Sequence, residues 1–173
     1  MTLTETTHLS APEPDASAPE VPRLTSDFFG FQGRLSGPEQ EAALRIRSFL
    51  EAEVRPIADR YWSRAEFPRH LIPSLARLGL LGAFVPEVRH FENSAVYRGW
   101  VALELARVDA GVATFVGVQS GLAMGAVHVG SSPEQQAAWL PRMASGEVVG
   151  AFGLTEPLSG SDSARGLRTT ARR

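Results

Sequence analysis

The residues of this chain best suited to chemistry lie close together near its end, in the sequence Leu-Thr-Glu-Pro-Leu-Ser-Gly-Ser-Asp at positions 154–162. Hydroxyls and glycines are concentrated there. Glycines let a backbone approach a ring or a phosphate closely, and the Thr155 and Ser161 hydroxyls can both donate and accept hydrogen bonds. The segment therefore suits a polar ligand, although the residues alone fit an ordinary surface turn better.

The elements around this segment have the composition of strands. Residues 148–155 are uncharged, contain β-branched and aromatic side chains, and are followed by Pro157, which predicts a strand. Residues 168–170 indicate the start of a second strand. Two strands alone are not stable in water, so they would need further partners.

Most of the preceding chain is patterned for helices. Apolar residues recur at three- and four-residue steps from Ser36 to about Trp62, with Pro56 predicting a kink. Three further helices are expected: residues 71–81 ending at a glycine cap on Gly82, residues 94–109, and a helix running from a capping box at 132–135 to about 146, distorted at Pro141.

Residues 110–130 carry no charged side chain, and that length could span a bilayer. Gln119, Ser120 and His128 interrupt the apolar character, and no aromatic belt or basic flank is present. We therefore expect a helix buried at the centre of a bundle. The glycines at 117, 121 and 125 would then let a neighbouring helix approach closely.

Composition excludes several classes of protein. A net charge of -2 over 173 residues offers no electrostatic footprint for nucleic acid or for an anionic membrane. The absence of cysteine excludes disulfides and thiolate zinc sites, and is compatible with a cytoplasmic location. All basic residues are arginine, which suggests a GC-rich bacterial genome. Residues 1–24 are polar and proline-rich and lack a secretory signal, so we expect a disordered leader.

Other polar residues are weak candidates for sites. His90 and His128 have no second ligand at metal-binding spacing, so no metal site is predicted. The arginines near the end suit a solvated edge better than a phosphate site; they are Arg165, Arg168, Arg172 and Arg173. Trp62, Trp100 and Trp139 are expected to anchor helix interfaces.

Several stretches together resemble one known family. The sequence Phe-Gly-Leu-Thr-Glu-Pro-x-x-Gly-Ser-Asp at 152–162 resembles the flavin-binding signature of the acyl-CoA dehydrogenases. Residues 104–110, 118–124, 134–136 and 139–147 are similar, in order and spacing, to that family's N-terminal helical domain. Tyr61-Trp62 and the sequence at 65–68 are similar to the glutaryl-CoA dehydrogenase branch.

The resemblance implies a mainly α fold: a helical domain over 25–146, then the first strands of a β domain over 147–173 that is truncated here. It implies FAD as cofactor, an acyl-CoA thioester as substrate and α,β-dehydrogenation as reaction. It assigns flavin contacts to Phe152, Gly153, Leu154, Thr155, Gly160 and Ser161, and an acyl-CoA contact to Ser161. The catalytic glutamate of the family lies beyond its middle domain, so no catalytic residue is assigned and the chain alone should be inactive.

The resemblance also implies an electron-transfer flavoprotein as redox partner and a homotetramer for the complete enzyme. Two departures affect the substrate. Ala113 and Thr114 stand where glutaryl-CoA enzymes carry an arginine for the distal carboxylate, which disfavours glutaryl-CoA. Residues 88–93 replace a glycine-rich loop. Two other functions remain: an acyl-CoA oxidase of the same fold, and a non-catalytic helical interaction module.

Overall fold

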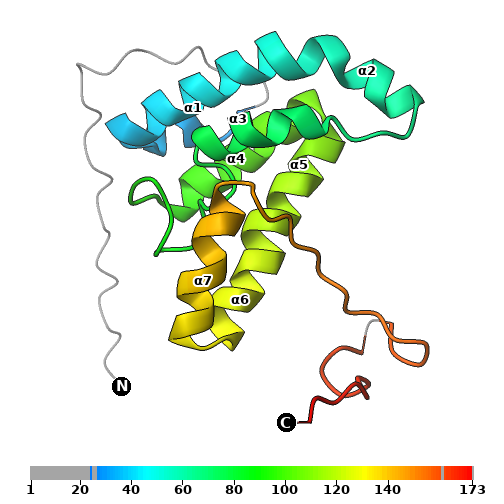
Figure 1. The fold of residues 1–173 in the computed structure, drawn as a ribbon. Coiled ribbons are helices and arrows are strands. Elements are labelled where there is room, and N and C mark those ends of the chain that lie inside the picture. The colour runs from blue at the N-terminus through cyan, green and yellow to red at the C-terminus, as the bar shows by residue number, and fades with distance from the viewer. Residues whose placement is uncertain (1–23, 25–26, 161, 173) are drawn as a thin grey trace, which may run out of the picture.

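The computed structural model describes residue 24 and residues 27–160 and 162–172. These residues form a bundle of helices followed by an extended segment that leaves the bundle (Figure 1). In chain order the helical elements are η1 (Phe31–Arg34), α1 (Gly37–Phe49), η2 (Leu50–Val54), α2 (Arg55–Ser63), η3 (Arg69–Leu71), α3 (Ile72–Arg77), α4 (Ala95–Val108), α5 (Ala110–Val116), η4 (Gly117–Ala123), α6 (Met124–Gly130) and α7 (Pro133–Ala144).

The first long helix, α1 to α2, begins where the sequence predicted. Ser36 and Glu39 form a reciprocal capping box, and Pro38 lies in the first turn. Before Pro56 the helix widens into the π-type turn η2, in which Arg55 N donates to Leu50 O five residues back. Because proline has no N–H and crowds the carbonyl four residues earlier, the wider turn accommodates Pro56 within a continuous helical path.

The second predicted helix is shorter than its leucine pattern suggested. α3 ends at Arg77, and the glycine in left-handed conformation is Gly79, with φ of 76°, not Gly82. The prediction of a helix to residue 81 capped by Gly82 was therefore wrong. Leu80 and Leu81 are fully buried in the turn after the helix. The apolar pattern extends past the end of α3 because these two leucines enter the core from irregular backbone.

Residues 110–130 form one continuous helical path, α5 to α6, that packs beside α7 (Figure 1). Asp109 caps its start, accepting a hydrogen bond from Val112 N at 2.6 Å. Only 33% of its most apolar window is buried, so the prediction of a helix buried at the centre of the bundle was wrong. Apart from the neighbouring backbone of the same helix, no heavy atom of the described chain lies within 4 Å of a Cβ built on Gly117, Gly121 or Gly125, so the glycine row faces open space.

Two apolar clusters hold the bundle together. The larger gathers residues from α1, η2, α3, α4 and α5, among them Ile46, Leu75 and Leu105. The smaller joins the start of α6 to α7 through Met124 and Leu140. Trp100 is buried as predicted, but Trp62 is 79% exposed and Trp139 45% exposed, so neither is the interface anchor expected from its helical spacing.

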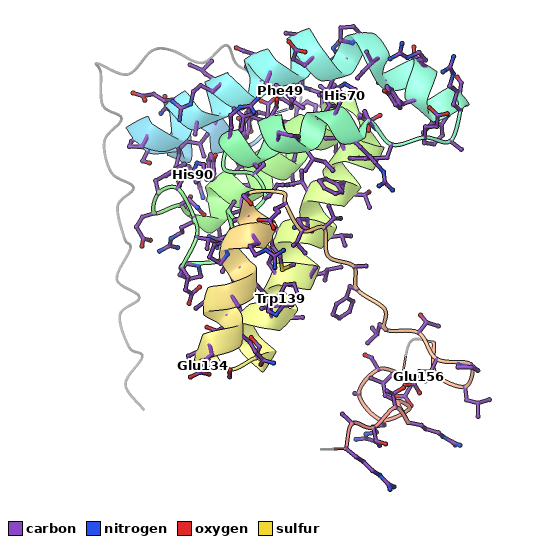
Figure 2. All side chains as sticks on the ribbon, viewed as in Figure 1. Phe49, His70, His90, Glu134, Trp139 and Glu156 are labelled. Atoms are coloured by element: carbon purple, nitrogen blue, oxygen red, sulfur yellow. The ribbon has the colours of Figure 1, made fainter. Side chains whose placement is uncertain are left out.

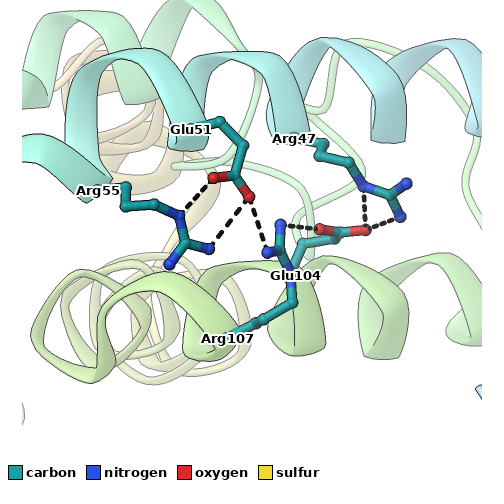
Figure 3. Close-up of polar contacts among 5 residues, drawn as sticks. All are labelled: Arg47, Glu51, Arg55, Glu104 and Arg107. Atoms are coloured by element: carbon teal, nitrogen blue, oxygen red, sulfur yellow. Dashed lines mark hydrogen bonds and ion pairs between the residues drawn. The ribbon is translucent and has the colours of Figure 1, made fainter. Parts of the chain in front are cut away.

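A buried ionic network fixes α1 and η2 against α4 (Figure 3). The Glu104 side chain is inaccessible to solvent and accepts hydrogen bonds from Arg47 Nε at 2.9 Å and Arg107 Nη2 at 3.1 Å. Arg107 Nη1 also contacts Glu51 Oε1 at 2.7 Å, and Glu51 pairs with Arg55. Each charge in this chain of contacts thus has a partner from a neighbouring turn or helix.

The predicted β strands are not formed in the described part of the chain. Residues 148–155 are extended, but the nearest strand-like contact is an isolated bridge between Glu156 and Ser159. A strand requires a neighbouring strand to pair its N–H and C=O groups. Residues 168–170 do not form such a partner strand for residues 148–155. The mainly helical class is therefore observed, whereas the start of a β domain is not. Of the predicted leader, only Leu24 is described, and it packs against the larger cluster.

Replacing Glu104 with glutamine should lower the free energy of unfolding by about 3 kcal/mol, because Arg47 and Arg107 both lose the charge of the buried carboxylate that they contact. Urea denaturation followed by circular dichroism measures this change. The matched control is Glu41→Gln: Glu41 is exposed and lies 3.7 Å from Arg45, so its loss should cost less than about 0.5 kcal/mol. Equal losses for the two variants would contradict a special role for the buried carboxylate.

Hydrogen bonds from Arg55 and then Arg107 lower the pKa of Glu51 from 4.5 to about 2. Because the folded pKa is depressed, Glu51 contributes stability above pH 4.5, and this contribution is lost as the pH falls toward about 2. A carboxyl ¹³C NMR titration should place the Glu51 midpoint near 2 and move it upward in Arg107→Gln. A wild-type midpoint near 4.5 would show that the pairing is not formed in solution.

Candidate flavin-contacting segment

The residues predicted to contact a cofactor lie on the segment that leaves the bundle after α7. Phe152 is 44% and Leu154 39% exposed, and Gly153, Thr155 and Gly160 are also exposed. Ser161 lies outside the described residues. The described candidates therefore all lie on one exposed stretch of the chain, and the helical domain does not cover them.

The start of this stretch is tied to the bundle by Gln119, which lies in the π-type turn η4 and is 1% exposed. Its Nε2 donates to Met143 O at 3.0 Å and to Val148 O at 2.9 Å, and its Oε1 accepts from Gly150 N at 2.7 Å. Sequence reasoning treated Gln119 only as an interruption of an apolar run. The available signal was that an amide inside an uncharged helix must find partners when buried.

Gly150 is required at this junction because its backbone touches the helices. A Cβ built on it would lie 2.7 Å from Ala123 Cβ and 2.8 Å from Met143 Cε. By contrast, no heavy atom of the described chain beyond its two neighbours lies within 4 Å of a Cβ on Gly153. The segment thus touches the smaller apolar cluster at Gly150, and at Gly153 there is open space where a side chain would project.

The turn after Pro157 folds on itself rather than onto the bundle. Glu156 and Ser159 exchange backbone hydrogen bonds at 3.0 Å, and Ser159, 3% exposed, donates from Oγ to Asp162 O at 2.8 Å. The Glu156 carboxylate accepts from Arg168 N at 2.7 Å and Thr169 N at 3.0 Å. These bonds lower the pKa of Glu156, with the Thr169 contact as the largest cause. Figure 2 shows Glu156 in this turn, well away from the helices.

Glu156 therefore has a structural task that sequence reasoning missed. Its carboxylate closes the loop by pairing the backbone N–H groups at which the second strand was predicted to begin. The carboxylates of Glu104 and Glu39 are likewise engaged, the latter accepting from Ser94 N at 2.6 Å and from Ser36 N at 2.9 Å. These three carboxylates are paired with arginine side chains or backbone N–H groups. Such pairing favours the charged form, so it suits a structural role better than the removal of a proton from a substrate.

Other polar and hollow regions lie elsewhere. His128 Nδ1 is 3.1 Å from Glu87 Oε2, and the described residues contain no group of three His, Cys, Asp or Glu that could hold a metal ion. An apolar cavity of about 540 Å³ lies between η1 and α4, with Phe28, Phe29 and Trp100 in its lining. The predicted flavin residues do not line this cavity.

The exposed stretch has groups that fit a flavin. Phe152 and Leu154 present apolar surface, and no hydrogen bond in the described chain occupies the backbone N–H and C=O groups of residues 151–155. A flat ring with a polar edge needs that combination of apolar contact and free backbone donors and acceptors. The Thr155 hydroxyl adds one more donor and acceptor.

Comparison with known proteins identifies the domain. The family model described as acyl-CoA dehydrogenase, N-terminal domain, matches residues 38–147. An acyl-CoA dehydrogenase of Bacillus subtilis is 36% identical over 127 residues, which are 73% of this chain and 33% of that protein. The chain belongs to the acyl-CoA dehydrogenase family, as its motifs predicted, and spans about a third of this relative's length.

Solved structures agree. A crystal structure of glutaryl-CoA dehydrogenase from Mycobacterium smegmatis is 42% identical with a TM-score of 0.69, covering 80% of this chain and 36% of that one. A second glutaryl-CoA dehydrogenase structure from Mycobacterium smegmatis, in complex with FADH2, is 36% identical with a TM-score of 0.70 and the same coverage. The predicted likeness to the glutaryl-CoA dehydrogenase branch is confirmed.

Replacing Gly150 with alanine should displace the segment from α6 and α7, because the Ala123 methyl cannot move aside. The expected loss is about 1–3 kcal/mol of unfolding free energy, the range for overpacking in a close-packed site. Methyl NMR should show shifts at Ala123 and Met143. Gly153→Ala is the matched control and should leave both methyl resonances in place; the same shifts in both variants would refute the close approach at Gly150.

Proposed function

We propose that this chain supplies the N-terminal helical domain and the first flavin contacts of an FAD-dependent acyl-CoA dehydrogenase. The observation that carries the proposal is the continuity between the matched domain, residues 38–147, and an exposed segment that bears the flavin-binding signature a few residues later. In this proposal the middle domain starts at residue 147. It is expected to supply strands that pair with residues 148–155.

The proposed reaction is α,β-dehydrogenation of an acyl-CoA thioester. When bound, FAD supplies the two-electron acceptor for this reaction. Phe152 and Leu154 would pack on the ring, and the Thr155 hydroxyl and backbone groups of 152–155 would bind its polar edge, with Gly160 and Ser161 at the turn. Ser161 would also contact the acyl chain. No acid of this chain is assigned as base, which accords with the structural engagement of Glu39, Glu104 and Glu156.

The substrate is proposed to lack a second carboxylate. Ala113 has no charge, and the Thr114 hydroxyl already donates to Ala110 O at 2.8 Å. A distal carboxylate would therefore meet no cation at this part of α5. The proposal includes an electron-transfer flavoprotein as redox partner, a homotetrameric complete enzyme and a cytoplasmic location, with neither nucleic acid nor membrane as a partner.

A chimera tests the flavin assignment. Residues 1–173 would replace the corresponding N-terminal part of the Mycobacterium smegmatis glutaryl-CoA dehydrogenase, and FAD content would be measured at about 450 nm after purification. We expect the chimera to retain FAD and the chain alone to show no acyl-CoA dehydrogenation. Thr155→Val should weaken FAD binding by about tenfold, the loss of roughly one hydrogen bond to a buried acceptor.

The matched control is Thr114→Val, which removes a hydroxyl on α5 that donates to Ala110 O within its own helix and should leave FAD content unchanged. A folded chimera that contains no FAD would refute the flavin assignment and favour a non-catalytic interaction module, for which exposed Leu122 and Val129 offer apolar surface. Rapid consumption of oxygen with acyl-CoA would identify an oxidase instead.

A further inference from the structure

Gln119 joins three backbone groups that belong to two different parts of the chain. One is Met143 O, in the last turn of α7, and the others are Val148 O and Gly150 N, on the segment that follows. All three contacts are 3.0 Å or shorter, and the glutamine is 1% exposed. The bonds are thus shielded from water, where losing a partner leaves an unsatisfied buried group.

A primary amide is the side chain that this junction requires. It has two N–H donors for the two carbonyls and one oxygen for the Gly150 N–H. Glutamate would keep the acceptor but lose both donors, and methionine would fill the space with neither. Gly150 also lies against Ala123 and Met143 so closely that a Cβ would clash. The segment is therefore held at Gly150 both by the amide and by close apolar packing.

Beyond Gly150 the hydrogen bonds between the segment and the helical domain end. No hydrogen bond in the described chain involves the backbone of residues 151–155, and the next bonds are those that Glu156 makes within its own turn. The place and direction in which Phe152–Thr155 start are consequently set by the contacts at residues 148–150. Val148 N donates to Arg142 O in α7 at 3.1 Å. Beyond Val148, the hydrogen bond from the helical domain is the one at Gly150, and it comes from Gln119 alone in the described structure.

We propose that Gln119 is a positioning residue for the flavin contact: it sets where the segment bearing Phe152, Leu154 and Thr155 leaves the helical domain. It touches neither the cofactor nor the reacting atoms and acts through the backbone of Val148 and Gly150. The expected effect on FAD binding rests on the proposed function, but the positioning of the segment by Gln119 is measurable without a flavin.

Gln136 provides a matched control. Its Nε2 also donates to two backbone carbonyls, His128 O at 2.8 Å and Ser131 O at 3.2 Å, in the turn between α6 and α7. Gln136→Met therefore removes two comparable bonds without touching residues 148–150. A role of Gln119 that was only structural would make the two methionine variants behave alike along the segment.

The experiment uses the full chain of 173 residues and the variants Gln119→Met, Gln119→Glu and Gln136→Met. We expect Gln119→Met to speed amide exchange at Gly150 by about tenfold or more, the equivalent of one hydrogen bond, and to lower the ¹⁵N order parameters of residues 151–155. Gln119→Glu keeps an acceptor for Gly150 N but sets a buried carboxylate against the carbonyls of Met143 and Val148, so it should loosen the segment at least as much as Gln119→Met. Gln136→Met should have no effect at these residues.

The same variants placed in the chimera test the consequence. Gln119→Met should raise the Kd for FAD about tenfold while Gln136→Met leaves it unchanged. Unaltered order of residues 151–155 in Gln119→Met, or equal loosening in Gln136→Met, would overturn the proposal, as would an unchanged FAD affinity despite a loosened segment. If even the wild-type chimera takes up no FAD, both the proposed function and the effect of Gln119 on FAD binding are refuted. The difference in order parameters between Gln119→Met and Gln136→Met still tests whether Gln119 anchors the segment.

Discussion

The buried carboxylate of Glu104 is the constraint on which the arrangement of the helices depends. A charge without access to water must be paired from several directions, and here Arg47 comes from α1 and Arg107 from the next turn of α4. Satisfying Glu104 therefore fixes the register of the long first helix over α4. Glu39 adds a second tie between the same helices, because one buried carboxylate caps the start of both α1 and α4.

Toward α7 the domain is held differently, by apolar packing around Met124 and Leu140 and by the amide of Gln119. This half also carries the junction to the exposed segment, so the same contacts that close the bundle determine how the segment departs. The structure thus combines an apolar cluster and an ionic network between α1 and α4 with a junction whose geometry depends on very few side chains.

Local signals predicted the helix starts well. Ser132 begins a helix through a capping box, as its spacing to Gln135 indicated, and the first long helix begins at the predicted start near Ser36, because capping involves only residues within one turn. Predictions that needed distant partners were less successful. The strand at 148–155 is not confirmed, since no partner strand lies beside it among the described residues. The leucines after α3 enter the core without a helix, and Trp62 is exposed.

The sequence by itself determined the family, the helical class and the identity of the candidate flavin residues, since motifs and helix periodicity are encoded by neighbours along the chain. Only the tertiary structure decided that Gln119 hydrogen-bonds the segment, that Glu156 closes the turn, and that much of the helix over residues 110–130 is exposed. Those outcomes depend on contacts between residues 12 to 31 positions apart or on surface left uncovered, and a linear pattern of residue types does not specify which distant groups meet.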